Sequence, residues 1–211
     1  MSDVTRSAVL AAASGVFADE GVGAATIGRI AARAGVTRPT VYAYFATKDA
    51  ILQALIGQVR DAFLAAQRVP ASDDPADVAG AVITEYLDLH IRHLPLLAAI
   101  DQRARTDPSV AAARDDLLAG VHRRNARFIT RLVAEGRADP ALDPHAVSEA
   151  ITGIVRRFAE LATGAGEGEG ERDRRAAEAT AAYLRLVGVR AASGPRDPSR
   201  REGAATRGVG R

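Results

Sequence analysis

The chain of 211 residues is 47% hydrophobic and 26% charged, which is enough apolar material for a buried core and excludes fibrous, low-complexity and wholly disordered classes. Its formal net charge of +2 arises in residues 190–211, which hold six basic and two acidic residues, so the charge is weak evidence that the folded body binds a polyanion. The absence of cysteine excludes disulfides and thiol catalysis, and the longest run without charge, residues 7–18, is too short to span a bilayer. We therefore expect a soluble, cytoplasmic protein.

Alanine, leucine and arginine dominate and alternating β-branched residues are almost absent, so the sequence predicts an all-α fold. Glycine and proline clusters divide the chain into about nine helices. The expected helices are 5–18, 27–34, a short helix from 37 to 45, 48–67, 76–93, 95–107, 108–135, and two last long helices, with apolar positions between 147 and 161 on the first and between 183 and 187 on the second.

Two short helices joined by a tight turn are expected within residues 26–45. Thr26 and Thr37 each stand where an N-cap belongs, because a threonine hydroxyl can accept a hydrogen bond from a free backbone N–H. Gly35 fits the left-handed residue that ends a helix, and Pro39 falls in the first turn of the second helix, where its missing N–H costs nothing. Such a pair is typical of a helix-turn-helix, whose second helix fits the major groove of DNA.

The candidate DNA contacts lie in and next to this second helix. They are Thr26, Thr37, Arg38, Pro39, Thr40, Tyr42, Ala43, Tyr44 and Lys48. Threonine and tyrosine hydroxyls suit phosphate oxygens, Arg38 suits a bidentate contact with guanine, and Pro39 and Ala43 offer apolar contact to a thymine methyl. The structural alternative is that the threonines and Pro39 are ordinary caps and that the tyrosines simply pack.

Residues 26–52 resemble the TetR family of bacterial transcriptional regulators. The matching residues run from Thr26 through Gly35-Val36-Thr37 to Phe45 and continue from Thr47 to Leu52. The resemblance implies an all-helical homodimer with a DNA-binding unit, a ligand-sensing and dimer-forming bundle, and a lysine at position 48 that grips the DNA backbone. The sequence departs from the pattern at Gly28, where some relatives place a long polar side chain that reaches a base.

The expected domains follow from this division. Residues 1–47 form the helix-turn-helix domain, and residues 48–189 form a ligand-binding and dimerisation domain that the connecting helix 48–67 enters. That helix has a broad apolar stripe that must be buried, so a shift at its far end could move the second helix of the motif. Residues 164–170 are expected to be a flexible acidic linker. The Arg-rich tail 190–211 is expected to be disordered, either as an inert end or with nonspecific attraction to DNA.

Polar residues interrupt otherwise apolar helix faces in the second domain. Such residues orient a ligand in a mainly hydrophobic pocket, but they also occur where a helix turns partly toward water. The ligand-pocket candidates are Tyr86, His90, His93, His122 and Asn125. No carboxylate or third histidine falls into register with His90 and His93, so we expect no metal site.

The last two long helices could complete the core or form half of an intersubunit four-helix bundle, and the resemblance favours the bundle. The candidate dimer contacts are Ile151, Ile154, Phe158, Leu161, Tyr183 and Leu186.

The main functional hypothesis is a ligand-responsive transcriptional regulator. It would be a repressor that binds double-stranded operator DNA as a homodimer and is released by an unknown small-molecule effector, with no cofactor and no membrane partner. The sequence contains no G-x-S-x-G elbow, no thiol and no telling pair of histidine and carboxylate, so we expect no enzymatic activity. The alternatives are an effector-independent DNA-binding regulator or activator, and a helical enzyme or scaffold with a similar fold.

Overall fold

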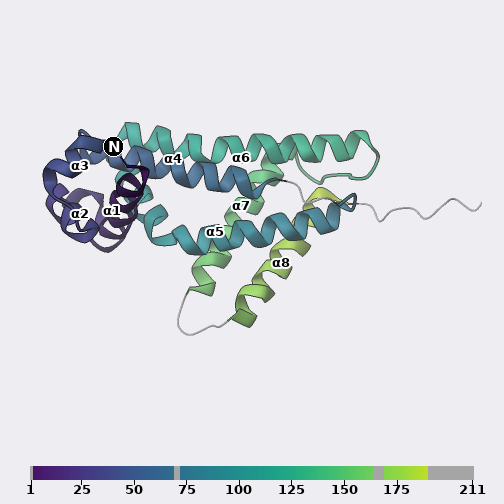
Figure 1. The fold of residues 1–211 in the computed structure, drawn as a ribbon. Coiled ribbons are helices and arrows are strands. Elements are labelled where there is room, and N and C mark those ends of the chain that lie inside the picture. The colour runs from purple at the N-terminus through teal and green to yellow at the C-terminus, as the bar shows by residue number, and fades with distance from the viewer. Residues whose placement is uncertain (1, 69–71, 164–168, 190–211) are drawn as a thin grey trace, which may run out of the picture.

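The computed structural model describes residues 2–68, 72–163 and 169–189, and these residues confirm the all-α prediction. The helices are α1 (Asp3–Ala24), α2 (Ile27–Ala34), α3 (Arg38–Tyr44), α4 (Lys48–Ala66), α5 (Pro75–Ala104), α6 (Pro108–Ala134), α7 (Pro144–Ala162) and α8 (Glu169–Val187). Figure 1 shows α1–α3 gathered at one end of the molecule, with α4 and α6 running side by side away from them. None of the described helices is both long and apolar enough to cross a membrane.

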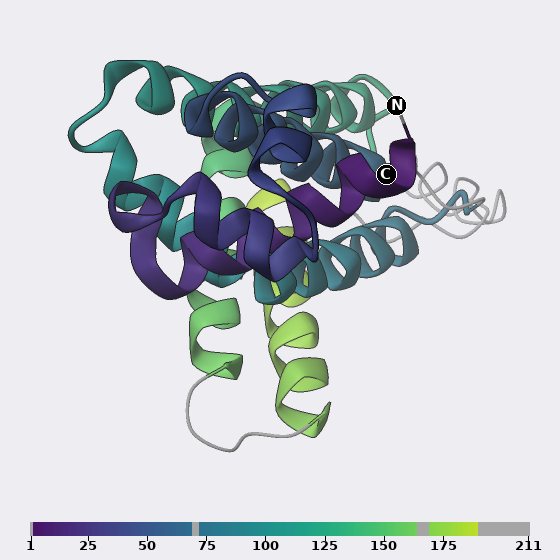
Figure 2. The same cartoon turned by 60° about the vertical axis from the view of Figure 1, so that its left-hand side comes forward.

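The two long C-terminal helices lie next to each other. α7 and α8 pack together and against α5, and the end of α7 and the start of α8 project beyond the other helices, as the turned view in Figure 2 shows. The predicted disordered tail at 190–211 lies outside the described residues, as does most of the predicted linker at 164–170.

The described residues form eight helices instead of the expected nine, because the two helices expected at 76–93 and 95–107 are merged into one, α5, which ends at Ala104. Pro95 lies inside α5, although proline removes a backbone hydrogen bond and costs ~3 kcal/mol in a helix interior. Leu89 before the proline and Leu96 after it are both buried. Packing of this continuous apolar face offsets the cost of the proline, so the helix does not end there.

Threonine caps fix where α2, α3 and α4 begin. The hydroxyls of Thr26, Thr37 and Thr47 accept hydrogen bonds from the backbone N–H three residues further on, at 3.3, 3.3 and 3.0 Å. Gly35 ends α2 in the left-handed conformation (φ 67°), which residues with a side chain rarely adopt. The predicted bounds of α2 and the predicted turn are therefore confirmed.

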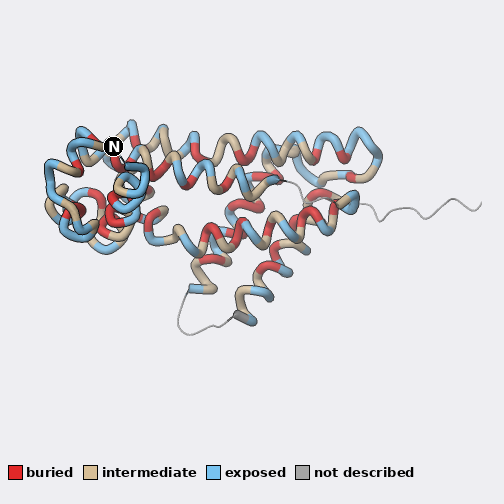
Figure 3. The backbone as a smooth tube through the Cα atoms, in the orientation of Figure 1, coloured by how far each residue is buried: buried red, intermediate tan, exposed pale blue. Residues whose placement is uncertain are grey.

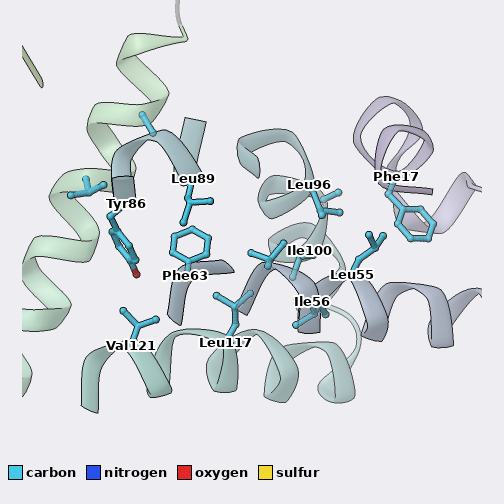
Figure 4. Close-up of a cluster of buried hydrophobic side chains, with 14 of the residues drawn as sticks. Phe17, Leu55, Ile56, Phe63, Tyr86, Leu89, Leu96, Ile100, Leu117 and Val121 are labelled. Atoms are coloured by element: carbon cyan, nitrogen blue, oxygen red, sulfur yellow. The ribbon is translucent and has the colours of Figure 1, made fainter. Parts of the chain in front are cut away.

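One hydrophobic core joins the N-terminal end of the molecule to the bundle. Buried residues follow the inner faces of the helices, and exposed residues lie on the outer faces (Figure 3). Phe17 of α1 lies near Leu55 of α4, and Phe63 of α4 meets the Tyr86 ring edge-on with centroids 4.8 Å apart (Figure 4). The apolar stripe predicted for the connecting helix is buried throughout. α4 therefore packs against α1 of the N-terminal unit and against α5 and α6 of the bundle.

Candidate nucleic-acid interface and interior cavity

The outer face of α3 holds most of the predicted DNA contacts. Its exposed residues, with the cap, are Thr37, Arg38, Pro39, Tyr42 and Ala43. Val41 on the opposite face is fully buried, and 54% of the Tyr42 surface is accessible. The core thus holds α3 by one side while a face with guanidinium and hydroxyl groups remains free for a partner.

The predicted contacts Tyr44 and Lys48 form hydrogen bonds within the chain. Tyr44 Oη accepts a hydrogen bond from the backbone N–H of Ser2 at 2.9 Å. Lys48 Nζ donates to the carbonyl oxygens of Gly23 and Ala25 at 3.0 and 2.9 Å. These contacts fasten α3 and α4 to the two ends of α1. Because an ammonium group has three donors, Lys48 keeps one for a phosphate.

The three threonines among the predicted DNA contacts form hydrogen bonds within the helix-turn-helix. Thr26 and Thr37 cap α2 and α3, which confirms the capping interpretation for both. Thr40 is half-buried, and its hydroxyl lies 2.9 Å from that of Thr37. Contact of these hydroxyls with DNA stays a prediction.

The arginines of α2 and α3 differ in their partners. Arg29 pairs with Glu20 at 2.7 Å, and Arg33 pairs with Asp19 at 2.5 Å. Among the described residues, none forms an ion pair or side-chain hydrogen bond with Arg38. A guanidinium without a protein partner loses no ion pair when it binds a base or a phosphate, so Arg38 is the best placed of the three to contact DNA.

Gly28 gives the Arg38 side chain its position. A Cβ atom placed on Gly28 would lie 2.5 Å from Nη2 and 2.9 Å from Nε of Arg38, closer than a real Cβ contact permits. The guanidinium therefore lies against the backbone of α2, which is possible because residue 28 has no side chain. The space that a long side chain of α2 would use is occupied by an arginine from α3.

A cavity of about 470 Å³ lies among α5, α6, α7 and α8, next to the end of α4. This volume falls in the range of small-molecule sites, ~300–1,000 Å³. Apolar side chains such as Ile83, Phe128 and Val155 make up most of its wall. Of the five predicted pocket residues, Tyr86 and Asn125 line it.

Polar groups in this cavity have specific positions. Within the described residues, no group bonds to the buried Gln67 Oε1 or Tyr86 Oη in good hydrogen-bond geometry, although Thr152 lies close enough to Tyr86 to lower its pKa slightly. Burial raises the pKa of Tyr86 far above its ordinary value, so its hydroxyl stays protonated. Arg124, Arg127 and Arg131 are exposed along one side of α6 and line the same cavity. Because unpaired buried polar atoms are unfavourable, the cavity favours an occupant that bonds to them.

The predicted pocket residues His90 and His93 are not among the residues that line the cavity. The His90 ring packs against Phe63 and Tyr86 with centroids 4.7 and 4.8 Å away, and its Nδ1 donates to the Tyr86 carbonyl at 2.9 Å. Burial lowers the pKa of His90 to about 4, so the ring is neutral near pH 7. Burial also lowers the pKa of the half-buried His93. His90 is therefore a core residue with a satisfied ring nitrogen.

His122, the third predicted histidine outside the cavity wall, faces α7. Its Nε2 lies 3.2 Å from Thr152 Oγ1, and its ring centroid lies 5.7 Å from that of His145. His145 Nδ1 is 3.5 Å from Glu149 Oε1. Burial lowers the pKa of His122. The possible metal ligands weighed from the sequence, His90 and His93 of α5, do not include this set, although His145 and Glu149 stand four residues apart on one helix and so lie on one face of it.

The predicted dimer contacts do not share one surface. Ile151 lines the cavity, and the buried Tyr183 donates its hydroxyl hydrogen to Asn125 Oδ1 at 2.8 Å, so both residues face the interior of the protomer. The remaining candidates, Ile154, Phe158, Leu161 and Leu186, are partly buried. The Phe158 ring is covered by the guanidinium of Arg175, 5.1 Å from its centroid. Of the six predicted dimer contacts, these four are therefore the ones that remain accessible to a second copy of the chain.

The N-terminal part of the chain matches a known family of sequences. Residues 9–55 match the family model for bacterial regulatory proteins, tetR family. The HTH-type transcriptional repressor BepR of Brucella suis biovar 1 (strain 1330) is 46% identical over 56 residues, which cover 26% of this chain and 27% of BepR. The HTH-type transcriptional repressor LfrR of Mycolicibacterium smegmatis (strain ATCC 700084 / mc(2)155) is 37% identical over 113 residues, 53% of this chain and 58% of LfrR. The matches thus span between a quarter and three fifths of these relatives.

Solved structures match nearly the whole fold. A bacterial regulatory protein in the tetR family from Rhodococcus RHA1 superposes with a TM-score of 0.74 at 24% identity, over 90% of this chain and 100% of that chain. Salmonella enterica GusR superposes with a TM-score of 0.72 at 17% identity, over 87% of this chain and 95% of that chain. At such identities the likeness establishes the arrangement of helices.

Proposed function

Because the chain belongs to the TetR family of bacterial regulatory proteins, which are not enzymes, we propose that it is a DNA-binding transcriptional regulator that reads its operator with α3. The supporting observation is the exposed face of α3, on which Arg38 has no ion-pair partner among the described residues. In this proposal Arg38 contacts a guanine edge, while Thr37, Tyr42 and Lys48 contact phosphates. Residues 1–47 are the DNA-binding unit, and residues 48–189 sense the effector and form the dimer.

We propose a homodimeric repressor, as BepR and LfrR are both named repressors. The partly buried residues Ile154, Phe158, Leu161 and Leu186 of α7 and α8 would meet the same helices of a second copy. Two copies of α3 would then contact half-sites one helical turn (~34–36 Å) or a multiple apart, so the operator is a near-palindrome.

The effector we propose is a small, mainly apolar molecule with an acidic group. The cavity wall is mostly apolar, and the buried Tyr86 Oη and Gln67 Oε1 would bond to its polar atoms. The exposed arginines 124, 127 and 131 of α6 favour a carboxylate at that side of the cavity.

The connecting helix α4 would transmit the presence of the effector. At its first residue, Lys48 bonds to the carbonyls of Gly23 and Ala25 beside α2. At its end, Gln67 lines the cavity; its Nε2 donates to the Val121 carbonyl at 3.1 Å, and its buried Oε1 has no partner among the described residues. A ligand that bonds to Gln67 would therefore shift the end of α4. Because the start of α4 is bonded to the DNA-binding unit through Lys48, this shift would also move that unit. Release of DNA requires that the ligand prefer the altered state by roughly 10⁴-fold, about 5.5 kcal/mol.

The test is a mobility-shift and footprinting experiment with the DNA upstream of the protein's own gene. We expect a protected near-palindrome at about 100 mM salt and a steep fall in affinity as salt is added. Absence of a footprint under these conditions contradicts operator binding. A thermal-shift screen of apolar carboxylic acids then tests the effector, and the expected ligand both stabilises the protein and removes the footprint. A footprint that no stabilising ligand removes favours the effector-independent regulator.

A further inference from the structure

We propose that His122, His145 and Glu149 form a binding site for a divalent transition-metal ion such as Zn²⁺. The three side chains come from α6 and α7, and one ligand atom from each lies within 4.8 Å of the others. In a tetrahedral zinc site with bonds of ~2.1 Å, ligand atoms lie roughly 3.4 Å apart. The three atoms would therefore have to move closer together, which the exposure of His145 and Glu149 permits.

The hydrogen bonds of Thr152 fix the tautomer of His122. Thr152 Oγ1 donates its single hydrogen to the Ser148 carbonyl at 2.9 Å, so it accepts from His122 Nε2 at 3.2 Å. His122 therefore has its proton on Nε2, and Nδ1 keeps an unprotonated lone pair available to a metal. A metal-binding histidine usually donates its second ring N–H to an oxygen acceptor, and Thr152 Oγ1 is such an acceptor here.

The donor set determines the class of ion. Two imidazoles and one carboxylate suit Zn²⁺, Ni²⁺ or Cu²⁺ better than Mg²⁺ or Ca²⁺, which prefer oxygen ligands alone. The chain has four histidines and no cysteine, so these two histidines are half of its imidazoles. Of the other two, His90 donates its Nδ1 hydrogen to a backbone carbonyl in the core. The chain thus offers a transition metal one place where two imidazoles meet an acidic side chain within the described residues.

Metal binding at this site would clamp α6 to α7 beside the cavity. His122 contributes from α6, whereas His145 and Glu149 contribute from consecutive turns of α7. Thr152, which orients His122, also lines the cavity. A bound ion would therefore stiffen one wall of the cavity. This inference does not depend on the proposed DNA binding.

The experiment uses the full chain without a histidine tag, stripped with a chelator. Zn²⁺ is titrated by calorimetry, and Co²⁺ is titrated by visible absorption, which reports nitrogen and oxygen ligands directly. We expect one ion per chain and a thermal stabilisation that a chelator reverses. His145→Gln and Glu149→Gln, at exposed positions, should each weaken binding at least ~10-fold, and Thr152→Val should weaken it ~10-fold by releasing the His122 tautomer.

The control is His93→Gln, which removes a histidine outside the cluster and should bind Zn²⁺ like the unaltered chain. Thermal unfolding of each metal-free variant verifies that it is folded. The proposal is overturned if the unaltered chain takes up neither ion at about 100 µM. It is also overturned if His145→Gln and Glu149→Gln bind as tightly as the unaltered chain, because the ion then lies elsewhere.

Discussion

The N-terminal unit of α1–α3 and the bundle of α5–α8 present their candidate functional residues in opposite ways. In the N-terminal unit these residues lie close together in sequence and face outward on α3. In the bundle the residues that line the cavity come from helices far apart in sequence, and most of them face inward. A substitution on the outer face of α3 therefore changes what the protein contacts, whereas one in the bundle also changes how it packs.

The largest expected difference between the two regions is in stability. Phe63 is fully buried between α4 and α5, so Phe63→Ala should lower the free energy of unfolding by about 3–5 kcal/mol. Tyr42→Ala on the exposed face of α3 should change it by less than about 0.5 kcal/mol. Urea denaturation measures both values. If the two substitutions lowered the free energy of unfolding by similar amounts, the face of α3 would not be free of packing as we infer.

The next difference is a pH dependence that arises in the bundle. Burial, with smaller contributions from Arg156 and His93, lowers the pKa of His90 from 6.5 to about 4. The unfolded chain therefore takes up this proton first, so the stabilisation is present above pH 6.5 and is lost as the pH falls toward 4. The loss should approach about 3 kcal/mol, measured by urea denaturation across this range.

A variant separates His90 from the acidic groups that titrate in the same experiment. His90→Leu should be less stable near neutral pH, because the bond to the Tyr86 carbonyl is lost, but its stability should fall less steeply between pH 6.5 and 4. Equal slopes for the two proteins would show that His90 is not the titrating group.

The difference between neighbouring residues on α3 and distant residues in the bundle also explains which features of the fold and the sites could be predicted from the sequence. The caps Thr26 and Thr37 and the turn at Gly35 obey rules that involve only neighbouring residues, so the bounds of α2 and the face of α3 were predictable. Pro95 obeys such a rule as well, but tertiary packing overrides it in α5. Local rules fail where distant helices supply the deciding contact.

Three features of the sites depend on such distant contacts. Gln67 and the arginines of α6 line the same cavity although they are more than fifty residues apart in the sequence, and no periodic pattern links them. His122 meets His145 and Glu149 only when α6 packs on α7. The contact of Arg38 with Gly28 depends on a side-chain conformation. Periodicity identifies the buried face of a helix but not which helix it meets.

Among the DNA contacts, Arg38 should have the largest effect. Arg38→Ala should lose about 1–3 kcal/mol of binding free energy and relax base preference at one operator position. Arg29→Ala is the matched control, because Arg29 is also exposed but pairs with Glu20 at 2.7 Å. Fluorescence anisotropy with single-base operator variants measures both. Unchanged base preference in Arg38→Ala, or a larger loss in Arg29→Ala, would contradict the assignment of the reading residue.

The smallest expected effect tests how Arg38 is positioned. Alanine is a better helix former than glycine by up to about 1 kcal/mol, and the clash at Gly28 involves only the mobile end of Arg38, so Gly28→Ala should leave stability unchanged or slightly raised. The new Cβ displaces the guanidinium from α2, so affinity for the operator should fall by no more than it does in Arg38→Ala. Adding Gly28→Ala to Arg38→Ala should then have no further effect on DNA binding. Gly57→Ala in α4 is the control, since a Cβ there meets nothing within 4 Å and should leave operator binding intact. If Gly28→Ala and Gly57→Ala bind the operator equally well, Arg38 reads DNA from a position that does not depend on its contact with α2.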